Sequence, residues 1–169
     1  MKHKTFIELV GPAKDKMYRL ALRLLVSKEA AEDAVQEVLM KLWSRNEKMS
    51  TYKNVEAFAM TMTKNYCFDQ LKLKQNNNLK IVHNNYEDHK SSPHQILEVD
   101  DELNFVKEIV ENLPEQQKVI FQLRDVEQYD FEEIAKMLEM NQTAIRVALS
   151  RARKTIREEI VKKHKYGIG

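Results

Sequence analysis

The sequence predicts an all-α protein with two small helical domains on a flexible linker, the C-terminal one containing a helix-turn-helix. Its 169 residues include only three Gly and three Pro, which is few for the many turns of a β-rich fold. Residues of high helix propensity, such as Leu, Glu, Lys and Ala, are abundant. Apolar residues recur at helical spacing on both sides of a polar central stretch. These observations indicate two helical units.

The first unit, residues 1–75, should contain three helices. Helical spacing of apolar residues in 17–26 predicts the first helix, Ser27 can cap the second, and Asn54 can cap the third. Their expected inward faces consist of Met17, Leu20, Ala21, Leu24 and Leu25 in the first helix, Ala31, Val35, Val38 and Leu42 in the second, and Val55, Phe58, Ala59, Met62 and Tyr66 in the third.

Residues 76–95 form the predicted linker, since helical periodicity fails there and Asn, His, Ser and Pro accumulate. Fully stretched, these 20 residues reach at most roughly 70 Å. That length lets two domains sit on DNA sites two helical turns apart, each turn being about 34 Å. The histidines at 83, 89 and 94 match no zinc-binding spacing. We therefore expect neither a metal site nor a cofactor.

The second unit, residues 96–165, begins near Ile96 with apolar residues at 97, 103, 106, 109, 110 and 113. Pro114 marks the start of the next helix, which should bury Val119, Ile120 and Leu123. A capping box of Asp130 and Glu133 predicts a helix from Phe131, with Tyr129 and Ile134 placed for a hydrophobic staple. This helix should bury Ile134, Ala135 and Leu138. Asn141 can cap a long helix over 142–160, with Ile145, Leu149, Ala152 and Ile156 as its core stripe.

A short helix, a tight turn and a longer helix are typical of a helix-turn-helix, whose second helix enters the major groove. No acid occurs between Gln142 and Arg157, so the outer face of this helix can approach phosphates. Base contacts should come from its N-terminal half and phosphate contacts from the rest. A plain helical hairpin with a basic outer face is the alternative. The candidate DNA contacts are Gln142, Thr143, Arg146, Val147, Ser150, Arg151, Arg153 and Lys154.

Charge is unevenly distributed although the net charge is only +2. Acids cluster around Glu32, Asp33 and Glu37 and again at 127–139, and each cluster is followed by a basic one. Solvated helix faces would explain any single cluster, whereas the repetition favours binding surfaces. In the third helix, Asn65 and Asp69 share one face with Lys72.

The expected location is the cytoplasm, because the first ten residues lack a secretory signal and no apolar run is long enough to cross a bilayer. The single cysteine, Cys67, cannot form an internal disulfide and is expected to be a buried structural thiol.

Three segments together resemble one protein family. YRLALRLLVSKEAAEDAVQEVLMKLW, FAMTMTKNYCFDQLKLKQ and LPEQQKVIFQLRDVEQYDFEEIAKMLEMNQTAIRVALSRARKTIRE are similar to bacterial RNA polymerase sigma factors of the extracytoplasmic-function (ECF) group. The resemblance covers nearly all of the chain outside the linker and tail. It implies sigma regions 2 and 4, core RNA polymerase and promoter DNA as partners, and an anti-sigma factor as a further partner. It implies no catalysis, no small-molecule substrate and no membrane insertion.

The resemblance also implies roles for particular residues. The run 31–37 looks like the helix that docks on the clamp of the polymerase, with Glu32, Asp33, Gln36 and Glu37 as the contacts. Lys64, Asn65, Asp69 and Lys72 correspond to the positions that open and read the −10 promoter element. Arg146, Val147, Ser150 and Arg151 match the positions that read the −35 element.

Three departures from the family pattern affect these roles. Lys72 replaces the usual Arg, which keeps the charge but loses bidentate phosphate binding, and Phe58 replaces a common Trp. Gln128 and Glu139 stand where glycines are common around the first helix of the helix-turn-helix, so its turn lacks a residue that adopts positive φ easily.

Two other classes of protein are alternative interpretations of the sequence. A free-standing helix-turn-helix regulator would form a stable dimer and bind duplex DNA without polymerase, but no apolar stripe is left over for a dimer seam. An enzyme is disfavoured because the sequence has no Gly-rich phosphate loop, no Ser/His/Asp spacing and no metal-ligand pair.

Overall fold

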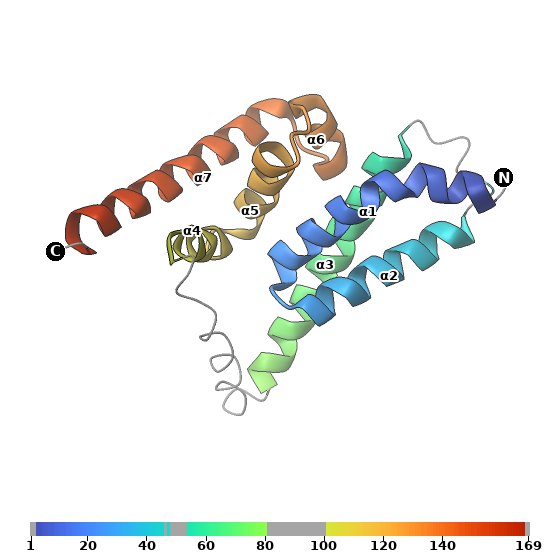
Figure 1. The fold of residues 1–169 in the computed structure, drawn as a ribbon, viewed down its shortest axis with the longest axis horizontal. Coiled ribbons are helices and arrows are strands. Elements are labelled where there is room, and N and C mark those ends of the chain that lie inside the picture. The colour runs from blue at the N-terminus through green and yellow to red at the C-terminus, as the bar shows by residue number, and fades with distance from the viewer. Residues whose placement is uncertain (1–2, 46, 48–53, 81–100, 168–169) are drawn as a thin grey trace.

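The computed structural model describes residues 3–45, 47, 54–80 and 101–167, and within these ranges it contains helices and no strand. The all-α class is thus confirmed, with two groups of helices that lie side by side (Figure 1). The histidines at 83, 89 and 94, and Ile96 and Leu97, lie outside the described residues. The helices are α1 (His3–Leu25), α2 (Lys28–Ser44), α3 (Val55–Lys80), α4 (Asp101–Glu111), α5 (Glu115–Phe121), α6 (Phe131–Leu138) and α7 (Gln142–Lys162).

Helices α1 to α3 form the N-terminal group, and two of their starts are set by side-chain caps that the sequence predicts. The Ser27 hydroxyl accepts a hydrogen bond from the backbone N–H of Ala30 at 3.1 Å, and the Asn54 side chain accepts one from Ala57 at 2.9 Å. Each cap satisfies an N–H group that has no partner within its own helix. The expected stripe of α2 is buried as well.

Helix α1 begins at His3 and runs through Gly11 and Pro12, whereas the sequence predicts a helix only from residue 17. The extra turns bury Val10 and Ala13 in the core. An internal proline costs a helix about 3 kcal/mol. Burial of these apolar side chains offsets that cost, so packing overrides local propensity here.

The connection between α1 and α2 passes through Val26, whose φ of 65° lies in the left-handed region. A β-branched residue is a genuine outlier there, and the conformation costs roughly 1–2 kcal/mol for residues with a Cβ. The side chain is 54% exposed, so it recovers little through burial.

Replacing Val26 by glycine is therefore expected to raise the free energy of unfolding by about 1 kcal/mol, because glycine adopts positive φ without strain. Urea denaturation of the two proteins measures the difference. Val161→Gly is the matched control, since Val161 is equally exposed but lies inside α7. The free energy of unfolding of this control should fall by about 0.5 kcal/mol, because glycine has a lower helix propensity than valine. A loss of stability in both variants would contradict the strain at Val26.

Helices α4 to α7 form the C-terminal group. Pro114 immediately precedes α5, which continues into a π-helical turn over Gln122–Val126. The predicted capping box at the start of α6 is confirmed: the Asp130 carboxylate accepts from the N–H of Glu133 at 2.8 Å, and the Glu133 carboxylate accepts from the N–H of Asp130 at 3.1 Å. The predicted cap of α7 is also present, with Asn141 accepting from Ala144 at 2.8 Å.

The turn between α6 and α7 forms without glycine. Glu139 ends α6 with a φ of 57°, and Gln128, just before α6, has a φ of 66°. Both positions therefore adopt the left-handed conformation that glycine would supply at lower cost. The helix-turn-helix predicted from the sequence is confirmed.

Most of the expected core residues are buried, with a few exceptions. Leu103 belongs to the predicted apolar run of the second unit but is 66% exposed on α4. Met60 and Met137 are buried although the sequence did not mark them as core, whereas Cys67 is buried as predicted. Helix α3 continues to Lys80, beyond the point where the sequence predicts that the linker begins.

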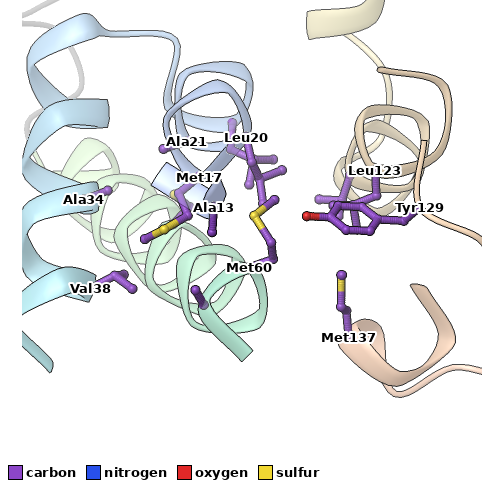
Figure 2. Packing of buried hydrophobic residues seen from close by; sticks show 14 of the residues in the cluster. Ala13, Met17, Leu20, Ala21, Ala34, Val38, Met60, Leu123, Tyr129 and Met137 are labelled. Atoms are coloured by element: carbon purple, nitrogen blue, oxygen red, sulfur yellow. The ribbon is translucent and has the colours of Figure 1, made fainter. Parts of the chain in front are cut away.

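One hydrophobic cluster runs through both groups of helices (Figure 2). Met17, Leu20 and Met60 of the N-terminal group share it with Leu123 and Tyr129 of the C-terminal group. A smaller cluster joins α4 to α7 through Val110, Leu113 and Ala152. The two groups are therefore in direct apolar contact.

Candidate functional site

The acidic face of α2 is exposed to solvent because the opposite side of the helix packs against the core. Ala31, Ala34, Val35 and Val38 face the core, so the helix turns Glu32, Asp33 and Gln36 into solvent, with Glu37 half-buried. Tyr66 of α3 lies close to these acids: burial raises the pKa of its hydroxyl, and the charges of Glu37 and Asp33 raise it further. The structure thus gathers all four candidate polymerase contacts on one helix.

Helix α3 carries the second candidate face. Asn65, Asp69 and Lys72 are all exposed on it, as their spacing predicts. Lys64 differs, because it is only partly exposed and lies over the ring of Phe68 at 5.8 Å. Burial lowers the pKa of Lys64, and the negative charge of Glu139 on the C-terminal group acts in the opposite direction.

Helix α7 carries the third candidate face. Its core side is Ile145, Leu149 and Ala152. Of the eight candidate residues on this helix, Gln142 is half-buried and the other seven, Thr143, Arg146, Val147, Ser150, Arg151, Arg153 and Lys154, are exposed. This arrangement suits a recognition helix, which needs polar and basic side chains on the surface that enters the groove.

Phe131, at the start of α6, helps to position the basic side chains, a role that the sequence did not reveal. The guanidinium group of Arg146 lies 4.8 Å from the centre of its ring, and that of Arg124 lies 4.3 Å away. Such cation–π contacts favour a fixed placement of the arginine. The sequence signal, an aromatic residue at the start of a capped helix, does not by itself indicate this contact.

Arg153 is held within the C-terminal group. Its Nε and Nη2 atoms donate to the two carboxylate oxygens of Asp125 at 3.0 and 2.6 Å. The hydrogen bond to Asp125 raises the pKa of Arg153. The pair ties the π-helical turn to α7 and fixes the guanidinium group that is a candidate phosphate contact.

Arg153→Ala is expected to lower the free energy of unfolding by about 0.5–1 kcal/mol, because it removes a bidentate but half-exposed ion pair. Arg151→Ala is the matched control: this arginine is exposed on the same helix, and its loss should leave stability nearly unchanged. Urea denaturation of both variants measures the difference. Equal stability of the two would show that the pair with Asp125 contributes nothing.

Two further properties concern membranes and metals. No helix in the described ranges is both long and apolar enough to span a bilayer. Over the same ranges, the histidine, cysteine, aspartate and glutamate side chains form no group of three placed to hold a metal ion.

Comparisons with known proteins define the class to which these faces belong. The family model for Sigma-70 region 2 matches residues 9–76, and that for Sigma-70 region 4 matches residues 106–156. No curated protein matches the chain. An acidic helix, a basic helix and a helix-turn-helix within these two regions define a transcription initiation factor. The chain belongs to the sigma-70 family, and it is an ECF sigma factor that binds core RNA polymerase and directs transcription initiation at promoters.

A solved structure shares the fold over nearly the whole chain. It is the sigma factor RpoE of Bartonella quintana, solved in complex with the anti-sigma factor NepR. The two chains are 23% identical, with a TM-score of 0.74, and the match covers 92% of this chain and 96% of RpoE. The likeness therefore extends through both groups of helices.

Proposed function

We propose that this sigma factor works through three separate faces, one for each contact that initiation requires. Glu32, Asp33, Gln36 and Glu37 on α2 dock on core RNA polymerase. Lys64, Asn65, Asp69 and Lys72 on α3 bind the −10 element. The outer face of α7 reads the −35 element. The proposed boundaries are region 2 at 1–75, the linker at 76–95 and region 4 at 96–165, with the end of α3 extending the first unit to Lys80.

The observation that carries this proposal is the segregation of charge onto different helices. The acids of α2 lie opposite its buried stripe, and the basic residues of α7 lie opposite Ile145 and Leu149. An acidic face repels DNA and attracts a basic protein surface, whereas a face without acids suits phosphates. The two helices therefore fit different partners.

Binding to promoter DNA should depend on the polymerase. A chain with a net charge of +2 neutralises few phosphates, so its own affinity for duplex DNA is low. Attachment to core polymerase places both DNA-binding faces at high effective concentration near the promoter. The α3 face then holds unstacked bases of the melted strand, and backbone contacts offset the cost of unstacking. The sigma factor itself makes and breaks no covalent bond.

Two further expectations concern location and regulation. The protein functions in the cytoplasm, where the polymerase is. RpoE was solved with an anti-sigma factor, and we infer that a protein of that class also binds this chain and covers the faces described above.

The test is gel filtration of the purified protein with and without bacterial core RNA polymerase, followed by transcription from a promoter library. A monomer that co-elutes with core and starts transcripts at defined sites is the expected result. A dimer that ignores core and shifts duplex DNA alone would instead support a free-standing regulator.

A further inference from the structure

A pocket of about 300 Å³ lies outside the three faces described above. Its walls come from the C-terminal end of α1, the connection to α2, helix α4 and the π-helical turn over Gln122–Val126. Pockets that bind small molecules in proteins have volumes of roughly 300–1,000 Å³. None of the residues proposed to contact polymerase or DNA lines this pocket. It is therefore large enough for a small ligand and free of the proposed functions of the chain.

Positive charge dominates the walls of the pocket. Arg19, Arg23, Lys28 and Lys107 line it, against a single acid among the lining residues, Glu111. The side chains of the two lysines are exposed, and neither forms an ion pair or hydrogen bond with another described residue. The cations that line the pocket therefore outnumber the acids available to neutralise them.

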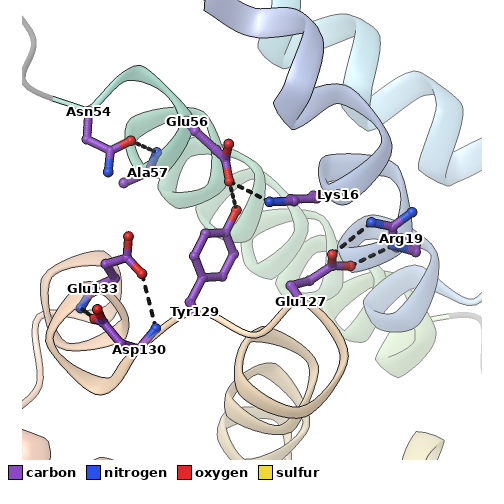
Figure 3. A network of polar contacts seen from close by, with 9 residues as sticks. All are labelled: Lys16, Arg19, Asn54, Glu56, Ala57, Glu127, Tyr129, Asp130 and Glu133. Carbon is purple, nitrogen blue, oxygen red and sulfur yellow. Dashed lines mark hydrogen bonds and ion pairs between the residues drawn. The ribbon is translucent and has the colours of Figure 1, made fainter.

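Arg19 is the one lining cation that is already held by an acid (Figure 3). Its Nε and Nη2 atoms donate to the two carboxylate oxygens of Glu127 at 2.7 and 2.8 Å. The Glu127 side chain is only 2% exposed and also accepts from Gln122 at 3.2 Å. The charges of Arg19 and Glu127 therefore cancel, and the pair fixes one wall of the pocket.

Arg23 has no such acidic partner. Its Nε atom donates to the neutral amide oxygen of Gln122 at 2.9 Å, and no carboxylate of the described residues forms an ion pair with it. Burial lowers the pKa of Arg23, and the negative charge of Glu111 opposes this only in part. A half-buried cation is stabilised by an anion beside it. The planar guanidinium group also matches the oxygens of a phosphate, to which it can donate two parallel hydrogen bonds.

A second desolvated cation lies near Arg23. Lys118 of α5 is only 5% exposed, and its ammonium group forms no hydrogen bond or ion pair with another described residue. Burial lowers the pKa of Lys118, the charges of Glu115 and Glu111 raise it, and the charge of Arg23 lowers it again. Because the two cations repel each other, an anion bound at Arg23 would stabilise both.

The remaining part of the pocket is apolar. Leu22, Val26 and Val126 line it, and the two valines are 54% and 40% exposed. Small-molecule sites typically combine an apolar lining with a few polar groups that fix the orientation of the ligand. This combination suits a molecule that carries an anionic group on an organic body better than it suits a bare ion.

We propose that this pocket binds a small phosphorylated molecule such as a nucleotide, with Arg23, Lys28 and Lys107 holding its phosphate group. The organic part of the ligand lies against Val26 and Val126. The inference goes beyond the proposed function and does not depend on it, since no residue of the three faces takes part.

Isothermal titration calorimetry of the full chain tests the site, in a phosphate-free buffer of low ionic strength without divalent cations. The probes are ADP, inorganic phosphate and adenosine. ADP is expected to bind with one-to-one stoichiometry and more tightly than inorganic phosphate, because its organic part also buries apolar surface of the pocket. Adenosine should show no measurable binding, because it carries no charge for the cations to pair with.

Lys28→Gln combined with Lys107→Gln is expected to weaken ADP binding about tenfold or more, because two charge-assisted contacts are lost. Both side chains are exposed, so the double variant should fold. Lys14→Gln combined with Lys136→Gln is the matched control. It removes the same charge from exposed positions outside the pocket, again one in each group of helices, and should bind ADP as the wild type does.

Glu111→Gln should change the affinity in the opposite direction. It removes the acid that competes with the ligand for the cations, so ADP binding is expected to tighten about threefold. A variant that merely disturbed the pocket would bind ADP more weakly. Tighter binding in this variant therefore supports an electrostatic role for the pocket cations.

Absence of saturable ADP binding would overturn the proposal, and so would equal weakening in the two lysine pairs. Binding of ADP on the α7 face would instead appear as a loss of affinity in Arg151→Ala, which would also overturn the pocket as the site. Inorganic phosphate that binds as tightly as ADP would contradict the role of the apolar wall.

Discussion

A sigma factor carrying Asp33→Lys and Glu37→Lys is expected to lose binding to core RNA polymerase, by more than about a hundredfold in affinity. Both acids lie on the α2 face, and their charges act together on Tyr66. Lysine in their place reverses the sign of the surface that meets a basic partner, so attraction becomes repulsion. Co-elution with core and a fluorescence titration measure the loss.

The control for this prediction carries the same change in net charge elsewhere. Glu108→Lys and Glu132→Lys replace two exposed acids of region 4, and they should leave core binding close to that of the wild type. Far-UV circular dichroism checks that both double variants fold. Wild-type affinity in the α2 variant would remove the docking hypothesis.

Arg151→Ala is expected to reduce transcription about tenfold or more from promoters that contain a −35 element, while core binding stays intact. Arg151 is exposed on the α7 face and lies one residue beyond Ser150, a candidate base contact. Loss of an arginine that binds a base edge or phosphate costs roughly 1–3 kcal/mol. Transcription in vitro with a fixed excess of core polymerase provides the measurement.

A second promoter makes this prediction specific. On a promoter whose −35 element has been replaced, the wild type and Arg151→Ala should perform alike. Lys162→Ala removes a charge from the last turn of the same helix and should behave as the wild type on both promoters. Equal loss of core binding and of transcription in Arg151→Ala would contradict the assignment of α7 to DNA.

The parts of the fold that depend on neighbouring residues could be predicted from the sequence. Four helices begin at a side-chain cap, and each cap accepts a hydrogen bond from the backbone N–H three residues further along the chain. A local sequence pattern is therefore enough to find the caps, which are Ser27, Asn54, Asp130 and Asn141. The inward stripes of α2 and α7 follow from helical periodicity in the same way. The three candidate faces are exposed because the stripes opposite them are buried.

The contacts between the two regions could not be predicted in this way. Arg19 and Glu127 are 108 positions apart, and Glu56 and Tyr129 are 73 apart. Tyr129 was interpreted as half of a hydrophobic staple, but its hydroxyl also binds across the boundary. No periodic pattern links residues so distant, because their meeting depends on how complete helices pack. For the same reason the sequence did not predict that α1 continues through Pro12, because that part of the helix is stabilised by burial of the neighbouring side chains.

The apolar cluster shared by both regions also determines how the unbound protein loses its structure. Regions with separate cores melt independently, whereas a shared core makes them melt together. Because Leu20, Met60 and Leu123 belong to one cluster, heating the unbound chain should give one calorimetric transition. A destabilising substitution in either region then lowers the stability of the other, so the two regions tolerate mutation as a single unit.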